Sequence, residues 1–192
     1  MLTDRKIQVP DEPLTYQEFV DRYGEDPTEI RKELAQVFGK IAVFWLESLG
    51  ISDVQHVKMR MAELEVNHSI VIYNNKITSY AATALRSLKA QKIIIETFSE
   101  QEMQINITKH ELQPRHIICS LATKKEMFAA YSVNPSMIPQ IKASTDPVCR
   151  WYGAEKGQLI KIVRPSESIK SVVLPDGKVK EFFDIYYRSV VA

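Results

Sequence analysis

Three short apolar runs alternate with helical patterns in the first half of the chain, and this alternation constrains the fold more than any other feature. The runs are Ile41–Leu46, Ser69–Tyr73 and Lys92–Phe98, each of strand length. Ser52 and Thr78 are predicted to cap the two intervening helices, in which apolar residues recur at helical spacing. Strands separated by helices favour right-handed crossovers. We therefore predict a small, mainly parallel sheet.

Two further helices are predicted before the first of these strands. Thr15 and Glu18 form a capping box, followed by apolar residues at helical spacing. A second helix is expected to begin with Asp26 as cap and Pro27 in the first position, and to end at Gly39. Its predicted apolar stripe consists of Ile30, Leu34, Val37 and Phe38. Both helices are interpreted as packing against a core.

The second half of the chain has a different pattern, with shorter elements separated by Pro and Gly. Residues 99–103 are expected to form a polar connector, and Thr123 with Glu126 is interpreted as a capping box that opens a helix. Asp146 and Pro147 are expected to start a short helix, which Gly153 ends before a strand over residues 158–163. The triplet Pro175, Asp176 and Gly177 between two extended runs predicts a hairpin turn.

Composition indicates an ordinary globular protein of one large or two small domains, since the 192 residues are 45% apolar and 26% charged. No apolar run approaches the roughly 18 residues needed to span a bilayer, and Met1 is not followed by a secretory signal pattern. We therefore expect an intracellular protein that does not interact with a membrane.

Charge is distributed unevenly between the two halves. Residues 1–105 carry 12 Lys and Arg against 16 Asp and Glu, whereas residues 106–192 carry 13 against 8. The net charges of −4 and +5 are too small for an independent, tight DNA binder. Docking of the second half on a larger, acidic partner fits this distribution better.

The Cys and His residues do not predict a metal site. Cys119 and Cys149 cannot complete a four-ligand zinc site, and we expect both to be reduced and buried. His110 begins a segment similar to a metalloprotease motif, but His116 is six positions away and Pro114 would break the helix. His110 is expected to be partly buried, and His116 to lie at the domain boundary. We predict no catalytic residue, cofactor or metal.

Two ordered blocks in the second half resemble a known family. The first comprises Ile105, Asn106, Ile107, Thr108, His110, Leu112, Pro114 and His116. The second comprises Asp146, Pro147, Val148, Arg150, Tyr152, Gly153, Lys156, Gly157, Gln158, Lys161, Ile162, Arg164, Pro165, Ser166 and Glu167. Their order and spacing resemble the assembly domain of the fifth-largest subunit shared by eukaryotic nuclear RNA polymerases, a family with a homologue in the archaeal enzyme. A weaker resemblance to the jaw domain of this family covers residues 69–98.

The resemblance implies a fold and a function. The fold class is α/β (α+β overall), with a jaw domain over residues 1–104 and an assembly domain over residues 105–192. The expected protein is a non-catalytic subunit, present in one copy per complex, that docks on the largest polymerase subunit and contacts other polymerase subunits. Its jaw would help to hold downstream duplex DNA. The expected location is the nucleus for a cellular protein, or the host cytoplasm or virion for one encoded by a large DNA virus.

The candidate DNA contacts lie in the polar loop between the second strand and the following helix. They are Asn75, Lys76, Thr78 and Ser79. A lysine beside a helix N-terminus can meet a phosphate, although a polar loop is also what solvent exposure alone requires. The resemblance implies that the matching loop lies beside downstream DNA. The family usually has proline at the position of Ser79.

The candidate docking residues cluster around the second motif block. They are Arg150, Trp151, Tyr152, Lys156, Lys161, Arg164, Pro165 and Glu167. Turns and short strands fix the backbone near the basic residues, which favours a preorganised protein contact. Trp151 and Tyr152 are predicted as aromatic anchors. A solvated strand face is the alternative interpretation of the charges.

Two alternative functions remain open at this point. The first is a Mg²⁺-dependent nuclease built on the jaw sheet, for which Glu63, Glu65 and Lys76 are the local candidates. The second is a transcription adaptor that binds polymerase transiently. The family pattern is also interrupted by residues 168–183, which we interpret as an inserted hairpin.

Overall fold

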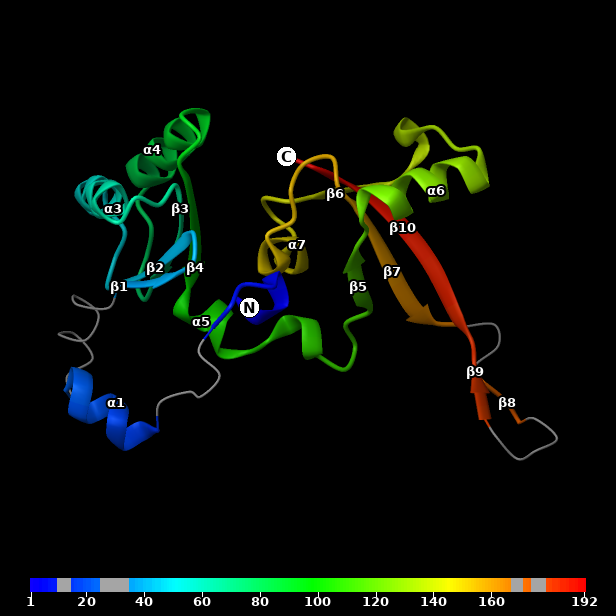
Figure 1. Ribbon diagram of the computed structural model, residues 1–192, viewed down its shortest axis with the longest axis horizontal. Helices are drawn as coiled ribbons and strands as arrows, with labels where there is room; N and C mark the ends of the chain where they lie inside the picture. The colour runs from blue at the N-terminus through cyan, green and yellow to red at the C-terminus, as the bar shows by residue number, and fades with distance from the viewer. Residues whose placement is uncertain (10–14, 25–34, 167–170, 174–178) are drawn as a thin grey trace. The chain divides into compact units, whose positions relative to one another are not determined.

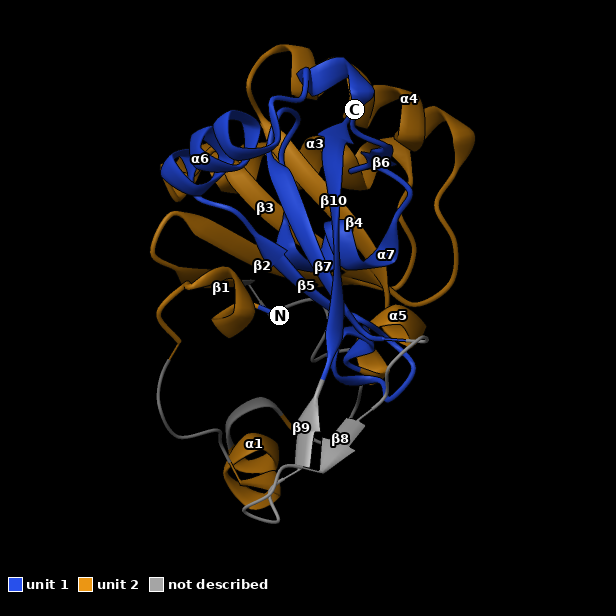
Figure 2. Ribbon diagram, turned by 90° about the vertical axis from the view of Figure 1, so that its right-hand side faces the viewer, with its two compact units in different colours: residues 1, 106–192 blue, residues 2–105 orange. Residues whose placement is uncertain are grey.

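The computed structural model describes residues 1–9, 15–24, 35–166, 171–173 and 179–192. The chain divides into two compact units, coloured separately in Figure 2. The N-terminal unit comprises residues 2–105, and the C-terminal unit comprises residues 106–192 together with Met1. A four-stranded sheet lies in each unit. The predicted α/β fold class is confirmed, whereas the assignment of two independent domains stays a prediction.

The sheet of the N-terminal unit has the strand order β1-β2-β3-β4. Strands β2 (Ile41–Leu46), β3 (His68–Tyr73) and β4 (Ile94–Ser99) are parallel, and β1 (Ala35–Phe38) pairs antiparallel with β2. The predicted parallel sheet is therefore confirmed, and it gains an antiparallel edge strand.

Strand β1 corrects the end of the second predicted helix. Val37 and Phe38 are strand residues, paired with Ala42 and Ile41. Gly39 adopts φ of 61°, a left-handed conformation that suits glycine and lets the chain reverse tightly into β2. The glycine therefore marks a hairpin rather than the end of a helix. The rest of that helix, residues 26–34, lies outside the described residues.

Helices α3 (Ile51–Glu63) and α4 (Ser79–Ala90) cover one face of this sheet, as Figure 1 shows. Their buried core consists of Ala42, Phe44, Leu49, Val54, Val57, Met61, Val66, Val71, Ala81 and Leu88. Thr78 caps α4 as predicted, since its Oγ1 accepts a hydrogen bond of 3.2 Å from the Ala81 amide.

The predicted cap of α3 at Ser52 is wrong. The helix begins at Ile51, after Gly50. The amide of Gly50 donates to the carboxylate of Asp53 at 2.7 Å, so an acidic residue in the first turn satisfies the backbone at the start of the helix. Ser52 already lies within that turn.

The opposite face of the sheet is also buried, at Val43, Ile70, Ile72 and Phe98. The 3₁₀ turn η1 (Thr3–Arg5) is tied to this face by a salt bridge. Two guanidinium nitrogens of Arg5 donate to the two carboxylate oxygens of Glu96, each at 2.7 Å. Nε2 of His68 lies 2.6 Å from Oε1 of the same Glu96. The first residues of the chain are therefore fixed to β3 and β4.

This contact changes the acidity of Glu96. Burial alone would raise its pKa, but the hydrogen bonds from His68 and Arg5 outweigh that effect and lower the pKa from its ordinary value of 4.5 to about 2. The side chain of Arg5 is only 5% exposed. The pair is therefore shielded from solvent far more than a surface ion pair is.

Two shorter helices belong to the N-terminal unit. Helix α1 (Tyr16–Tyr23) begins with the predicted capping box of Thr15 and Glu18. Helix α5 (Glu100–Gln104) replaces the predicted polar connector. Ser99 and Glu102 form a second capping box there, with the Ser99 amide donating to Glu102 at 2.8 Å. Because this helix has only five residues, it shows no apolar periodicity in the sequence.

The sheet of the C-terminal unit has the order β5-β7-β10-β6. Strand β7 (Leu159–Pro165) lies between β5 (Arg115–Ile118) and β10 (Phe183–Val191) and is antiparallel to both. Strand β6 (Gln140–Lys142) runs parallel to β10. The mixed sheet agrees with the predicted α+β architecture.

Helices pack on both faces of this second sheet. Helix α7 (Pro147–Tyr152) contributes Cys149 to a cluster with Ile160 and Ile162, and helix α6 (Leu121–Tyr131) contributes Met127 to a cluster with Leu159. The 3₁₀ turns η2 (Ile107–Lys109) and η3 (Pro135–Met137) lie in the same unit. Each face of β7 therefore contributes to a different cluster.

The caps of these helices follow the predictions in one case only. Asp146 caps α7, accepting from the Cys149 amide at 2.8 Å, and Gly153 ends it with φ of 63°. Helix α6 instead begins after Ser120, whose Oγ accepts from the Thr123 amide at 3.1 Å. The predicted cap at Thr123 is wrong because this residue is the third of the helix.

Residues 168–183, interpreted from the sequence as an inserted hairpin, contain a two-stranded sheet. Strands β8 (Ser171–Val173) and β9 (Val179–Glu181) pair antiparallel, as expected for a hairpin. The predicted turn at Pro175, Asp176 and Gly177 lies outside the described residues. Among the helices that the structure describes, none has the length and apolar composition of a membrane span.

Candidate nucleic-acid and docking surfaces

The candidate DNA loop is joined by hydrogen bonds to the loop that follows the neighbouring strand. The amides of Asn74 and Asn75 donate to the carbonyls of Leu46 and Glu47 at 3.2 and 2.9 Å. Farther along, the Leu49 amide donates to the Lys76 carbonyl at 3.1 Å, and the Thr78 amide donates to the Leu49 carbonyl at the same distance. The parallel pairing of β2 and β3 thus continues beyond the strands, which restrains residues 74–78.

The side chains of this loop differ in what they offer a ligand. Nδ2 of Asn75 donates to Oε1 of Glu47 at 2.9 Å, and Oγ1 of Thr78 caps α4. Lys76 and Ser79 are both exposed. The structure places Asn75, Lys76 and Thr78 in the loop and Ser79 at the first position of α4, and it gives Asn75 and Thr78 internal hydrogen-bond partners. Their contact with DNA stays a prediction.

The first turn of α4 adds a residue that the sequence interpretation missed. Tyr80 follows Ser79, and 76% of its surface is exposed. An exposed aromatic ring beside a helix N-terminus is suited to packing on a sugar or base while the helix amides face an anion. Its position two residues after the capping threonine was visible in the sequence.

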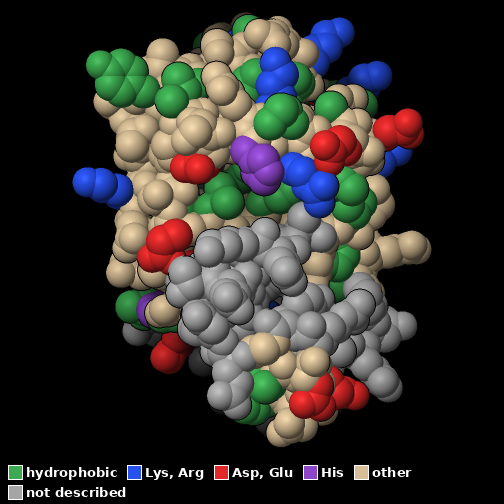
Figure 3. All heavy atoms as spheres, turned by 90° about the vertical axis from the view of Figure 1, so that its left-hand side faces the viewer, with side chains coloured by type: hydrophobic (Ala, Val, Ile, Leu, Met, Phe, Trp, Pro, Cys, Tyr) green, Lys and Arg blue, Asp and Glu red, His purple; other side chains and the backbone are tan. Residues whose placement is uncertain are grey.

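On the face drawn in Figure 3, basic, acidic and apolar side chains are interspersed rather than forming a continuous basic surface.

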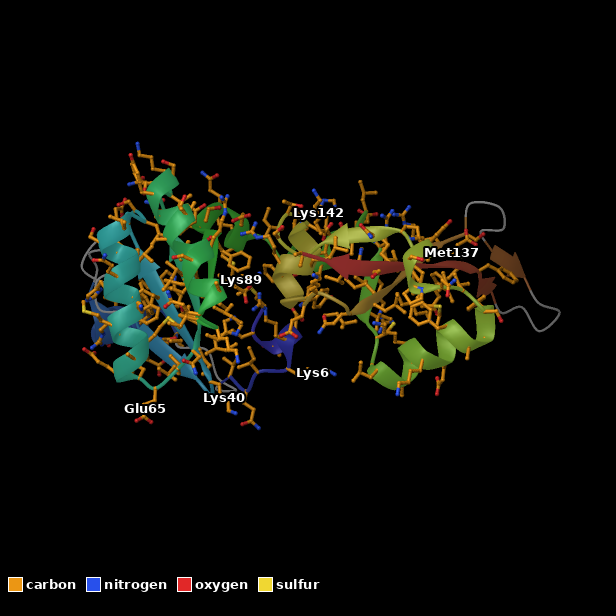
Figure 4. All side chains as sticks on the ribbon, turned by 90° about the horizontal axis from the view of Figure 1, so that it is seen from above. Lys6, Lys40, Glu65, Lys89, Met137 and Lys142 are labelled. Atoms are coloured by element: carbon orange, nitrogen blue, oxygen red, sulfur yellow. The ribbon has the colours of Figure 1, made fainter. Side chains whose placement is uncertain are left out.

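The structure separates the residues proposed for a nuclease site. Glu63 and Glu65 precede β3, whereas Lys76 follows it, so the six residues of the strand hold them roughly 20 Å apart. Glu63 pairs with Arg60 at 2.8 Å, and Glu65 points away from the sheet in Figure 4. Within the described residues, no group of three or more His, Cys, Asp or Glu side chains could hold a metal ion. The geometry does not support the nuclease alternative.

The His residues of the first motif block act locally. His110 is exposed, which corrects the predicted partial burial, and its Nδ1 accepts from the Leu112 amide at 3.2 Å. His116 is half-buried, and its Nδ1 lies 2.7 Å from the Pro114 carbonyl oxygen. Its role at a domain boundary stays a prediction.

The two Cys residues differ in burial. Cys149 is fully buried, as predicted, and burial together with the nearby Asp146 raises the pKa of its thiol to about 12. Cys119 is only half-buried, and burial raises its pKa as well. Both thiols are free of disulfide bonds. A raised pKa disfavours the reactive thiolate, so neither is suited to nucleophilic chemistry.

The predicted docking residues do not form one patch. Along β7, Lys161 pairs with Tyr187 and Arg164 pairs with Asp184, so the two basic side chains lie on opposite faces of the sheet. The guanidinium of Arg164 lies 5.5 Å from the ring centroid of Tyr186, which is a cation–π contact. A partner that covers one face would therefore meet only one of the two charges.

The remaining docking candidates also differ in accessibility. Trp151 is only 5% exposed, so little of its ring is accessible to a partner. Arg150 and Tyr152 are half-buried, while Lys156 and Pro165 are exposed. Glu167 lies outside the described residues. The docking role of each stays a prediction, but burial makes Trp151 a poor anchor for a partner.

An exposed apolar surface lies on the face of the sheet that carries Lys161. Helix α6 packs against this face at Leu159 and Tyr187, and the part beyond them is open. Phe183, Ile185 and Ile117 are 51%, 50% and 37% exposed there. We call this surface the open sheet face, and it consists of Ile117, Lys161, Val163, Phe183 and Ile185. Strand alternation in β5 and β10 was the sequence signal for it.

The fold defines an α/β protein of two units, each built around a four-stranded sheet. Comparison with known proteins gives the family. Residues 105–174 match the family model described as RNA polymerase Rpb5, C-terminal domain. The chain belongs to the Rpb5 family of DNA-directed RNA polymerase subunits, which confirms the resemblance inferred from the motif blocks.

Similar proteins extend the match over most of the chain. It is 31% identical over 182 residues to the "DNA-directed RNA polymerases I, II, and III subunit RPABC1" of Caenorhabditis briggsae, covering 88% of this chain and 85% of that protein. It is 32% identical over 181 residues to the Dictyostelium discoideum rpabc1 protein, covering 88% and 86%. It is also 32% identical over 177 residues to the Arabidopsis thaliana "DNA-directed RNA polymerase subunit 5-like protein 1", covering 85% and 83%.

Proposed function

We propose that this chain is a non-catalytic structural subunit of a multisubunit DNA-directed RNA polymerase. Its C-terminal unit docks on the largest subunit, its N-terminal unit helps to hold downstream duplex DNA, and other chains add the nucleotides. The observation that carries this proposal is the match over 88% of the chain to a subunit of RNA polymerases I, II and III. The expected location in a eukaryotic cell is the nucleus.

The open sheet face supports the docking part of this proposal. Three exposed apolar side chains, Phe183, Ile185 and Ile117, share this face with the half-buried Lys161, and Ile117 lies directly opposite it on β5. An interface core of this kind gains free energy from apolar burial, and a single charge adds specificity. The surface is presented by three paired strands, so its backbone is already ordered before a partner binds.

The hydrogen-bonded loop supports the DNA part. Lys76 is exposed between the restrained residues Asn75 and Thr78, next to the N-terminus of α4. A lysine and helix amides together favour contact with a phosphate rather than with a base edge. This contact would therefore be independent of DNA sequence, as holding a moving duplex requires.

Purification from the native source tests the proposed function. A structural subunit should co-elute with the largest polymerase subunit at one copy per complex, and this ratio should persist through a high-salt wash. A transient adaptor would instead give a ratio that falls with washing. Absence of the chain from every polymerase fraction would refute both views.

A further inference from the structure

Glu47 is an acidic residue in the loop that supports the proposed DNA contact. It is exposed and follows β2 directly. Its Oε1 accepts hydrogen bonds from Nδ2 of Asn74 at 3.2 Å and from Nδ2 of Asn75 at 2.9 Å. Its backbone carbonyl also accepts from the Asn75 amide at 2.9 Å. One residue of the first loop thus holds both asparagines at the start of the second.

The charge of Glu47 is unfavourable for a surface that faces DNA. A carboxylate near a phosphate chain repels it, and Lys76 is only one residue beyond Asn75. The two amide contacts give Glu47 a different use. We propose that Glu47 is a positioning residue: it fixes Asn74 and Asn75 so that Lys76 and the first turn of α4 are presented to the duplex in one arrangement. This inference rests on the DNA contact proposed above.

The gain from such positioning is preorganisation. A loop that is free in solution must be ordered when a ligand binds, and that ordering weakens binding. Backbone hydrogen bonds already join the loop to Leu46, Glu47 and Leu49. The side chain of Glu47 adds two contacts at the point where β3 ends and the loop begins. Without them, we expect residues 74–76 to sample several arrangements.

Two substitutions separate positioning from charge. Glu47→Gln removes the negative charge but keeps a carbonyl oxygen that can accept from both asparagines. Glu47→Ala removes the same charge and the acceptor together. If Glu47 acted only through its charge, both variants would bind DNA equally and more tightly than the wild type. If it positions the loop, the alanine variant must bind more weakly than the glutamine variant.

The experiment uses polymerase assembled with each variant and a downstream duplex of fixed sequence, titrated over a range of salt concentrations. We expect the Glu47→Ala complex to bind roughly threefold to tenfold more weakly than the Glu47→Gln complex, since each lost hydrogen bond contributes modestly. Because the variants have equal charge, this ratio should not change with salt. Glu65→Ala and Glu65→Gln, at the other end of β3, form the matched control and should bind equally.

A second measurement reports on the loop itself. Amide hydrogen exchange at Asn75 and Thr78 in the full chain should be faster in Glu47→Ala than in Glu47→Gln. Equal exchange and equal DNA affinity in the two variants would overturn the positioning role. If those variants are equal while Lys76→Ala weakens binding, only this inference fails. If Lys76→Ala has no effect at any salt concentration, the proposed DNA contact fails and the inference fails with it.

Discussion

Replacing Arg5 with alanine should destabilise the N-terminal unit far more than its position near the chain start suggests. Arg5 forms a two-pronged contact with Glu96, 91 residues away, and its side chain is only 5% exposed. Glu96 is 23% exposed, so the removal leaves a partly buried carboxylate with one partner fewer. The contact between His68 and this carboxylate would remain.

The lowered pKa of Glu96 gives the magnitude of the stabilisation that its contacts provide. The difference between its ordinary pKa of 4.5 and about 2 corresponds to about 3 kcal/mol at about 1.4 kcal/mol per pKa unit. Since the folded-state pKa is lowered, this stabilisation is fully present above about pH 5 and is lost as the pH falls toward 2. Arg5 supplies one of two groups of contacts, so Arg5→Ala should cost about 2 kcal/mol at pH 7.

Amide hydrogen exchange in β3 and β4 measures this loss, because it reports the opening free energy of the N-terminal unit alone. Arg60→Ala is the control, since Arg60 and Glu63 form a pair that is 45% and 60% exposed and should contribute less than about 1 kcal/mol. A double-mutant cycle with Glu96→Gln isolates the pair from other contacts of Arg5. Equal losses for Arg5→Ala and Arg60→Ala, or an unchanged pH dependence without Arg5, would refute the reasoning.

Three other substitutions test the surfaces and the first hairpin. Lys161→Glu should reduce co-purification with the largest subunit about tenfold or more, while Arg164→Glu on the opposite face should not. Equal effects of the two substitutions would exclude the open sheet face as the docking surface. Lys76→Ala should lower the slope of log affinity for DNA against log salt by about 0.9, whereas Lys58→Ala should leave it unchanged; matching slopes would remove Lys76 from the contact. Gly39→Ala should cost about 1 kcal/mol in the exchange of the β1 and β2 amides, because φ is 61° there, and an unchanged rate would contradict this strain.

Local patterns in the sequence predicted most of the fold. The apolar runs that became β2, β3 and β4 are short and rich in β-branched and aromatic residues, and the caps at Thr78 and Asp146 act within a single turn. The edge strand β1 could not be predicted in this way. Val37 and Phe38 fit the helical spacing of the apolar residues before them. Their pairing with β2 across the hairpin at Gly39 nevertheless makes them strand residues.

The sequence predicted some features of the candidate DNA and docking surfaces and not others. Asn75, Lys76 and Ser79 lie within five consecutive positions of the sequence, so they are neighbours in any fold. Burial of Trp151 depends on tertiary packing, which local spacing does not reveal, and the Arg5–Glu96 pair joins residues that no periodicity connects. The opposite directions of Lys161 and Arg164 follow from strand alternation, which the predicted strand already implied.

Strand β7 lies between two neighbours and faces two different helices, so adjacent residues along it meet different surroundings. Ile160 and Ile162 pack toward α7, while Lys161 between them belongs to the open sheet face. Substitutions at neighbouring positions of this strand therefore have separate structural effects. A change of charge or size at Lys161 alters the outer surface, while the interior that Ile160 and Ile162 form is kept.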